Sequence, residues 1–189
     1  PDWLWRELPL LNPGSSGELY LTGLVARAAE QGVGVVDVAV DHAWEALGIN
    51  TRLDLANAEE VLRQRIREHW MLEGVTMVDP ATTYIDAQVV LERDTRIWPN
   101  TYLLGNTRIG QGCAIGPNSL VRDSNVGARC RVLASVLEDA TLEDDVSVGP
   151  YSHLREQAYL AQGVHVGNFG EVKHSRLGSG VKMGHFTYI

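Results

Sequence analysis

The sequence predicts a mixed fold, with helices and one strand over the first 75 residues and a left-handed parallel β-helix after them. The first observation behind the β-helix is a period of six. From Ile85 to Ile189 an aliphatic residue recurs every six residues, with four steps of five. The second is that glycine often follows this residue, as in IGQGCA and VGPYSH, and a small or β-branched residue often lies four positions after it. Such hexapeptides are typical of a triangular coil.

Composition narrows the classes of protein that the chain can represent. Its 189 residues are 44% hydrophobic and 21% charged, which is typical of a soluble globular protein, and its net charge of −8 argues against nucleic-acid or anionic membrane partners. No apolar run approaches the roughly 20 residues of a membrane span, and no signal peptide is visible. Two cysteines indicate a reducing, cytoplasmic setting. Because the sequence starts at Pro1 rather than methionine, we expect it to be an excerpt of a longer protein.

Residues 1–53 carry the patterns of a helix and a strand. Four apolar residues fall on one helical face: Leu21, Leu24, Val25 and Ala28. Gly32 then provides a helix stop. Three valines alternate as in a half-buried strand: Val36, Val38 and Val40. We interpret this segment as the end of an α/β domain.

Residues 54–75 are predicted to form a linker helix that begins at Asp54, a plausible N-cap, and ends at Gly74. Its apolar residues recur at helical spacing: Leu55, Ala58, Leu62, Ile66 and Trp70. A helix of about 20 residues spans roughly 30 Å, which is enough for a strut between two domains.

Residues 76–189 are predicted to form the β-helix, whose interior holds one aliphatic residue per hexapeptide. These positions are Ile85, Leu91, Ile97, Leu103, Ile109, Ile115, Val121, Val126, Val132, Leu137, Leu142, Val148, Leu154, Leu160, Val166, Val172, Leu177, Met183 and Ile189. Three hexapeptides make one coil, so residues three positions apart in this series stack at about 4.8 Å. A helical interpretation fails because each glycine would cost it about 1 kcal/mol.

The stacking brings together two cations, Arg155 and Lys173, which follow Leu154 and Val172. Two stacked cations repel each other, and a bound dianion such as phosphate would turn repulsion into attraction. The alternative is that both are solvated surface cations that bend apart. His185 and Tyr188 belong to a hexapeptide two positions later, so we expect them on another face of the prism.

Cysteines and histidines leave further alternatives open. Cys113 and Cys130 should stack, which permits either ordinary packing of small residues or a disulfide. Four histidines raise the possibility of zinc at a subunit contact, although their spacing is not diagnostic: His153, His165, His174 and His185.

Several motifs are more specific than the hexapeptides, and residues 18–189 resemble the middle of the bacterial bifunctional N-acetylglucosamine-1-phosphate uridyltransferases/glucosamine-1-phosphate N-acetyltransferases. ELYLT and GINTR resemble EYYLTD and GVNNR of that family, and GVTMVDP resembles its GV-x-x-x-DP. GPYSHLR, HVGNFGEVK and KMGHFTYI resemble GPFARLRP, HVGNFVEMK and KAGHLTYLGD. The resemblance implies that residues 1–53 end a Rossmann-like nucleotidyltransferase domain.

The resemblance also implies activities, ligands and site residues. The β-helix of that family forms homotrimers and transfers acetyl from acetyl-CoA to glucosamine 1-phosphate. Arg155 and Lys173 would hold the sugar phosphate, Tyr188 would contact the sugar, and His185 would be the general base. Asn50 would help to bind Mg²⁺ and the uridine nucleotide where UTP gives UDP-N-acetylglucosamine, a precursor of the cell envelope.

The chain departs from the family pattern at two places. Glu156-Gln157 replaces Pro-Gly beside Arg155, and Gly23 replaces an aspartate. We expect the nucleotide loop to precede Pro1 and the acetyl-CoA contacts to follow Ile189, so this segment alone would complete neither site. Two alternatives stay open: a hexose-1-phosphate nucleotidyltransferase with a non-catalytic β-helix, and a structural trimerisation module.

Overall fold

The computed structural model describes residues 2–189, which form two compact units that divide between Leu47 and Gly48. The helices are α1 (Asp2–Glu7), η1 (Leu8–Leu10), α2 (Gly23–Glu30), η2 (Ala43–Ala46), α3 (Arg52–Leu72) and η3 (Pro80–Thr82). Within residues 2–189, no helix combines the length and the apolar character needed to cross a membrane.

The first unit is held together by α1 and α2. Half of the predicted helical face is confirmed, because Leu24 and Ala28 are buried in α2. The other half is wrong: Leu21 precedes the helix, and both Leu21 and Val25 are exposed. The carboxylate of Glu7 is also buried, and it accepts hydrogen bonds from Arg27 (Nη2, 2.6 Å) and Gln31 (Nε2, 2.9 Å). The hydrogen bond from Arg27, followed by that from Gln31, lowers the pKa of Glu7 below its ordinary value. Glu7 is therefore an ionised carboxylate within this small unit.

The strand predicted at Val36, Val38 and Val40 is wrong. Residues 33–40 form no strand, and Val36 and Val38 are 85% and 89% exposed. Within residues 2–47 no other strand is present to pair with this segment. Alternation alone cannot form a sheet, because the backbone groups of a strand need a neighbouring strand.

Helix α3 begins with a capping box. Thr51 is the N-cap: its hydroxyl accepts a hydrogen bond from the Asp54 amide at 3.1 Å, and the Asp54 carboxylate accepts one from the Thr51 amide at 2.8 Å. The helix was expected to begin at Asp54, but Asp54 is the third residue within it. The reciprocal pair satisfies two backbone amides that the helix itself leaves free. The N-cap is therefore Thr51, three residues before the expected Asp54.

Replacing Asp54 with asparagine is expected to weaken the loss of stability in acid. Hydrogen bonds from Thr51 and from the backbone amides of Asn50 and Thr51 lower the pKa of Asp54 below its ordinary 3.8. The ionised carboxylate therefore stabilises the fold at pH values above its pKa in the unfolded chain. This stabilisation is lost as the pH falls through its lower pKa in the folded protein. Circular dichroism melting between neutral pH and about pH 3 would measure the change. The matched control is Asp37→Asn on an exposed loop, and identical acid profiles for Asp54→Asn and wild type would contradict the expectation.

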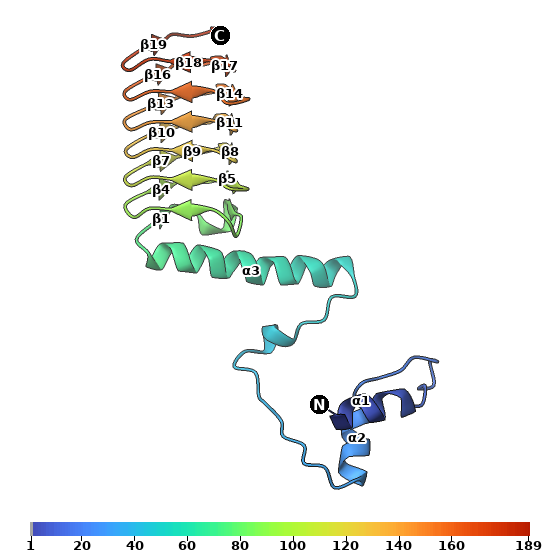
Figure 1. Ribbon diagram of the computed structural model, residues 1–189. Helices are drawn as coiled ribbons and strands as arrows, with labels where there is room; N and C mark the ends of the chain where they lie inside the picture. Colours follow the sequence, from blue (N-terminus) through green and yellow to red (C-terminus); the bar gives the residue numbers. More distant parts are fainter. Residues whose placement is uncertain (1) are drawn as a thin grey trace. The chain divides into compact units, whose positions relative to one another are not determined.

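The second unit is a parallel β-helix of three sheets, which confirms the predicted fold (Figure 1). The first sheet contains β1 (Thr76–Met77), β4 (Arg96–Ile97), β7 (Ala114–Ile115), β10 (Arg131–Val132), β13 (Ser147–Val148), β16 (His165–Val166) and β19 (Lys182–Met183). The second contains β2 (Thr83–Ile85), β5 (Thr101–Leu104), β8 (Leu120–Arg122), β11 (Val136–Glu138), β14 (His153–Arg155) and β17 (Glu171–Lys173). The third contains β3 (Val90–Leu91), β6 (Arg108–Ile109), β9 (Asn125–Val126), β12 (Thr141–Leu142), β15 (Tyr159–Leu160) and β18 (Arg176–Leu177).

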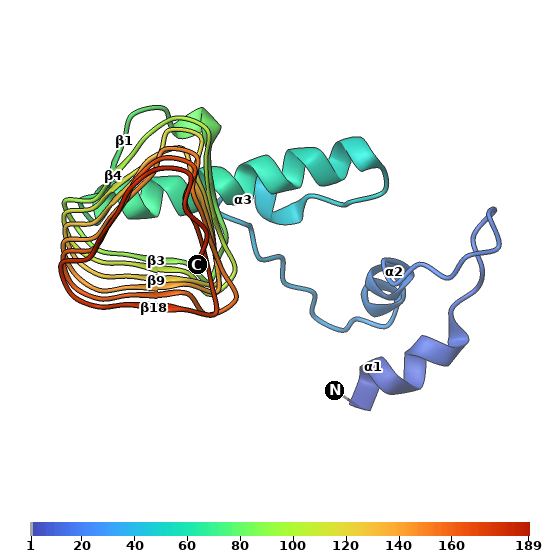
Figure 2. The same cartoon turned by 90° about the horizontal axis from the view of Figure 1, so that it is seen from above.

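The hexapeptide positions form the core of the coils, which stack as rounded triangles in Figure 2. Every predicted aliphatic position except Ile189 is buried, and Ile189 is 41% exposed at the last coil. Met77 in β1 is a further buried position that lies eight residues before Ile85, because η3 is inserted between them. The six-residue count therefore missed the first member of the series.

The four steps of five residues fall at shortened corners and leave the stack in register. Val126 still pairs with Ile109, and Leu137 pairs with Val121. A non-glycine residue with positive φ occupies each shortened corner: Asp123 (46°), Ala134 (43°), Asp139 (51°) and His174 (46°). Because the strand register is kept, the loss of one residue is absorbed in the turn and not in the strands.

Helix α3 crosses the first coils of the β-helix (Figure 1). Ile66 and Trp70 are partly buried against the core, and the guanidinium of Arg63 lies 5.1 Å from the ring centre of Tyr84. The end of a solenoid would otherwise expose its apolar interior, and a covering element prevents this. The linker helix is therefore part of the β-helix unit.

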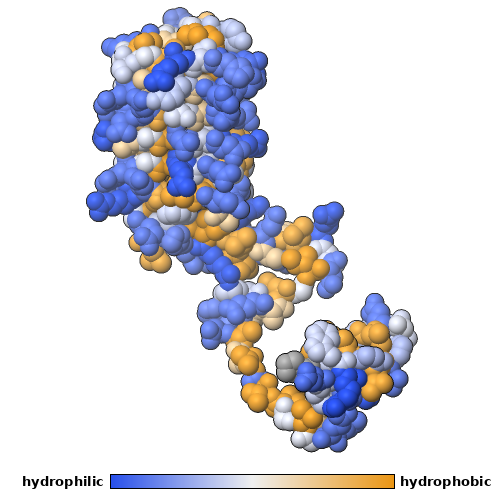
Figure 3. All heavy atoms as spheres, in the orientation of Figure 1, coloured by the Kyte–Doolittle hydropathy of each residue, from blue (hydrophilic) through white to orange (hydrophobic). Residues whose placement is uncertain are grey.

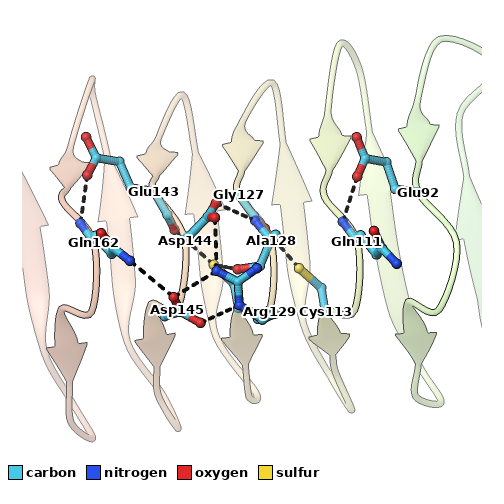
Figure 4. Close-up of polar contacts among 11 residues, drawn as sticks. Glu92, Gln111, Cys113, Gly127, Ala128, Arg129, Glu143, Asp144, Asp145 and Gln162 are labelled. Carbon is cyan, nitrogen blue, oxygen red and sulfur yellow. Dashed lines mark hydrogen bonds and ion pairs between the residues drawn. The ribbon is translucent and has the colours of Figure 1, made fainter.

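Side chains of one coil bind backbone groups of the next at the corners (Figure 4). Asp144 accepts a hydrogen bond from the amide of Ala128 at 2.9 Å, and Arg129 bridges Asp144 (3.0 Å) and Asp145 (2.7 Å). The hydrogen bond from Arg129 lowers the pKa of Asp145 below its ordinary value. The face of the β-helix in Figure 3 carries many such hydrophilic side chains, while the aliphatic positions lie inside.

Candidate functional site

Arg155 and Lys173 lie side by side at the ends of two neighbouring strands. The register pairs Leu154 with Val172 and Arg155 with Lys173, so the predicted stack is confirmed. The aliphatic residues point into the core and are fully buried, and their neighbours are half-buried on the outer surface. The sheet ladder thus places two cationic side chains on one face of the β-helix.

Two carboxylates lie between and beside these cations. Glu156 accepts from Arg155 Nη1 at 2.9 Å, and its second oxygen lies 3.3 Å from Lys173 Nζ and 3.2 Å from His174 Nε2. Glu171 accepts from Arg155 Nε at 2.8 Å and lies 2.6 Å from Nη2. The expected bare pair of repelling cations is therefore wrong, because the chain supplies its own counter-ions.

The carboxylates also set the ionisation of this cluster. The hydrogen bond to Glu171 is the main cause that raises the pKa of Arg155. Burial raises the pKa of Glu156, but the hydrogen bond and charge of Lys173, with the charges of Arg155 and His174, outweigh it and leave the pKa below its ordinary value. At neutral pH the cluster thus presents the Arg155 guanidinium and the ionised Glu156 carboxylate, an arrangement that can bind an anion by exchange.

Tyr188 joins the same face, which corrects the expectation that it lies on another one. Its backbone forms a parallel bridge with Glu171, and the Lys173 amide donates to the Ile189 carbonyl at 2.8 Å. The last hexapeptide crosses the corner after Met183, so Ile189 lies one coil beyond Val172. The exposed Tyr188 side chain therefore belongs to the surroundings of the Arg155–Lys173 cluster.

His185 lies on the corner between β19 and Tyr188, and its side chain is exposed. Its ring meets the ring of Phe186 edge-on at 5.6 Å, and no hydrogen bond or ion pair to it occurs within residues 2–189. Phe186 continues an aromatic column from earlier coils. Its ring centre lies 5.0 Å from that of Phe169, which in turn lies 5.4 Å from that of Tyr151. The structure therefore places His185 on the corner that leads into the cluster's face, with its ring nitrogens making no hydrogen bond within residues 2–189.

Comparisons with known proteins agree with the fold and the motifs. Residues 88–123 match the family model "Bacterial transferase hexapeptide (six repeats)". The bifunctional protein GlmU of Exiguobacterium sibiricum is 44% identical over 178 residues, which are 94% of this chain and 40% of that protein. GlmU of Pelobacter propionicus is 45% identical over 179 residues, or 94% of this chain and 39% of that protein. The chain is thus similar to the bifunctional GlmU proteins over 94% of its length.

The resemblance seen in the motifs is thus confirmed, and the chain spans about two fifths of the length of these GlmU relatives. Solved structures show the fold alone. The acetyltransferase domain of PglB from Neisseria gonorrhoeae has a TM-score of 0.55 at 12% identity, covering 65% of this chain and 62% of that chain. PerB from Caulobacter crescentus, in complex with CoA and GDP-perosamine, has a TM-score of 0.50 at 20% identity, covering 70% and 59%.

Asn50, which the resemblance predicts to be a magnesium ligand in a uridyltransferase site, lies just before α3. The backbone amide of Asn50 donates to Asp54 Oδ2 at 3.1 Å. The same oxygen accepts from the backbone amide and the hydroxyl of Thr51, so this carboxylate is engaged in capping the helix. Residues 2–189 contain no group of three His, Cys, Asp or Glu side chains that could hold a metal.

The remaining cysteine and histidine candidates serve packing and surface contacts. Cys113 and Cys130 are buried free thiols that donate to the Gly127 (3.0 Å) and Glu143 (3.1 Å) carbonyls. Three histidines have separate partners: His153 with Glu138, His165 with Ser147, and His174 with Glu156. Packing, and not a disulfide, is the arrangement present in the structure.

The sequence interpretation missed the roles of Glu156 and Glu171. Glu171 lies within HVGNFGEVK, one residue before Val172, and residues on both sides of a core position point outward. That count would have placed Glu171 beside Arg155 on the neighbouring coil. Glu156 was recognised as a change in the chain, but its contacts depend on a corner in which both Glu156 and Gln157 have positive φ, at 50° and 66°.

Proposed function

We propose that this chain holds the sugar-phosphate part of an acetyltransferase site that acts on glucosamine 1-phosphate. The observation that supports the proposal is the stack of Arg155 and Lys173, whose cationic groups converge on one carboxylate. A phosphate offers more charge and more acceptor oxygens than that carboxylate, and charge-assisted hydrogen bonds from Arg and Lys suit it. Tyr188, on the same face, would contact the sugar ring.

Acetyl-CoA would supply the acetyl group as a thioester. The 2-amino group of the sugar is protonated in water, so a base must remove one proton before nitrogen can attack the thioester carbonyl. A new C–N bond then forms, the C–S bond breaks, and the CoA thiolate takes up a proton. We assign the base to His185, because histidine ionises near neutral pH and this ring has no internal partner that would occupy it.

Replacing Lys173 with alanine is expected to raise the KM for glucosamine 1-phosphate by about 10- to 100-fold, because a hydrogen bond to a charged group contributes about 1.5–3 kcal/mol. Thiol release from acetyl-CoA by the natural protein that carries this sequence would measure it. Lys182→Ala is the matched control, because Lys182 is the other lysine and lies on the first sheet, in register with His165.

Three outcomes distinguish the candidates. Release that depends on Lys173 but not on Lys182 supports the acetyltransferase. Equal effects of the two substitutions would show that Lys173 has no specific role. A folded protein that releases no thiol would contradict the acetyltransferase assignment. It would favour a nucleotidyltransferase with a structural β-helix, or a trimerisation module without activity.

The second activity in the proposal is uridylyl transfer from UTP to N-acetylglucosamine 1-phosphate, giving UDP-N-acetylglucosamine. Its support within this chain is the GINTR motif, in which Asn50 would contribute one ligand to Mg²⁺ and bind the nucleotide. The other ligands would come from residues outside this sequence. Such an enzyme would feed cell-envelope synthesis from the cytoplasm.

A homotrimer completes the proposal. Within residues 2–189, His185 makes no hydrogen bond or ion pair with the Arg155–Lys173 cluster. A second copy packed against this face could bring a base and a phosphate site together across the contact. Analytical ultracentrifugation would show a single species of three chains if this is correct.

A further inference from the structure

The corner after β14 places a carboxylate where an anionic ligand would bind. Glu156 lies within hydrogen-bond distance of Arg155 (2.9 Å) and near Lys173 (3.3 Å) and His174 (3.2 Å). Two carboxylate oxygens thus face three basic groups from two successive coils. An oxyanion arriving from solvent would meet the same three groups, so it must compete with Glu156.

The two carboxylates at this site differ in how firmly they are held. Glu171 is part of β17, and it binds the Nε and Nη2 edge of Arg155. Glu156 lies on the corner, outside the strands, and binds the remaining Nη1 group. The Glu156 side chain is 42% exposed, so it can leave its position toward water without breaking a sheet contact.

Building on the proposed sugar-phosphate site, we propose that Glu156 occupies the phosphate position in the free protein and must be displaced when the phosphate binds. Glu156 then sets the affinity with which the site binds a phosphate group. A phosphate dianion carries twice the charge of the carboxylate that it displaces, so it gains attraction in the exchange, whereas a ligand without a phosphate gains nothing. The residue therefore lowers the affinity for the sugar phosphate and leaves ligands that do not enter the phosphate position unaffected.

The ionisation of Glu156 agrees with this role. Burial raises its pKa, and Lys173, Arg155 and His174 together lower it further than burial raises it. The carboxylate is therefore charged at neutral pH and competes as an anion. Glutamine at this position would keep the shape and the length of the side chain and remove the charge.

Calorimetric titration with glucosamine 1-phosphate tests the proposal on the natural protein that carries this sequence. Glu156→Gln should bind about two- to fivefold more tightly than wild type, the range expected when a partly exposed ion pair no longer competes. Glucosamine, which lacks the phosphate, should bind both proteins equally. The gain should vanish in the double variant Glu156→Gln/Lys173→Ala.

The matched control is Asp139→Asn, an exposed carboxylate at the same corner one coil earlier. The carbonyl of Asp139 accepts from the Gln157 amide at 2.8 Å, so it is close in space, and its carboxylate makes no hydrogen bond or ion pair within residues 2–189. Its replacement should leave the affinity unchanged. Glu156→Asn is a second variant in case glutamine perturbs folding, because asparagine tolerates the positive φ of 50° at this position.

The outcomes separate this inference from the proposed function. Binding of glucosamine 1-phosphate by wild type, with equal or weaker binding by folded Glu156→Gln and Glu156→Asn, overturns the role of Glu156 and leaves the acetyltransferase proposal standing. An equal gain in Asp139→Asn would reduce the effect to net charge and overturn it as well. Absence of binding in every variant overturns both.

Discussion

Replacing His185 with alanine is expected to lower the turnover rate of acetyl transfer by about 10²- to 10⁴-fold, the range that a positioned general base contributes. The substrate amine is protonated in water, and without a base little of it can attack the thioester. The side chain is exposed and has no hydrogen bond within residues 2–189, so its loss should leave the melting temperature unchanged. KM for the sugar phosphate should change little, because the phosphate contacts belong to other residues.

Thiol release under saturating substrates would measure this effect. His165→Ala is the control: His165 is also exposed, and its ring is hydrogen-bonded to the Ser147 hydroxyl, at 2.7 Å, on the neighbouring coil of the first sheet. A variant at His185 that keeps wild-type turnover would assign the base to another residue. A loss of the same size in both variants would point to a general disturbance of the coils.

Replacing Leu154 with alanine is expected to destabilise the β-helix by about 2–5 kcal/mol, the range for large-to-small changes in a packed core. Leu154 is fully buried and is paired with Leu137 on one side and Val172 on the other. With a hydrogen-bonded coil on both sides, the backbone cannot collapse into the space left behind. Because Arg155 follows directly, the same change should also weaken the proposed phosphate site.

Thermal melting would show the effect as a fall in Tm of about 5–15 °C. Leu133→Ala is the matched control, because Leu133 lies in the preceding coil but is 41% exposed, and surface changes cost little. Equal melting temperatures for Leu154→Ala and the control would mean that the coil can close around the cavity. That result would contradict the rigid scaffold on which the site depends.

Rigidity of the coils has a direct bearing on the site. Arg155, Glu171 and Lys173 project from strands whose positions are set by the sheet ladder, while Glu156 projects from a corner. The strands hold two cations and one carboxylate in fixed register, and the corner residue is the one free to move. The fold thus separates the permanent parts of the site from the exchangeable one.

The sequence by itself determined the β-helix, its core and the stack of Arg155 on Lys173. These follow from a local period of six and from the spacing of neighbouring strands, which is the same in every sheet, so counting residues was sufficient. Helix α2 and the linker helix α3 were also predicted correctly in kind, because apolar residues recur in them at helical spacing. Only part of each predicted face is covered: Leu24 and Ala28 are buried in α2, and Ile66 and Trp70 are partly buried in α3.

The tertiary structure alone decided which groups meet. Val36 and Val38 form no strand because no neighbouring strand pairs with them within residues 2–47. The alternation of apolar residues does not show whether such a neighbour exists. Tyr188 joins the face of Glu171 because the last hexapeptide turns a corner. Glu156 reaches Lys173 on the next coil because its own corner has a left-handed backbone. Contacts between coils depend on the directions of side chains at corners, and a repeat count gives their order along the chain but not those directions.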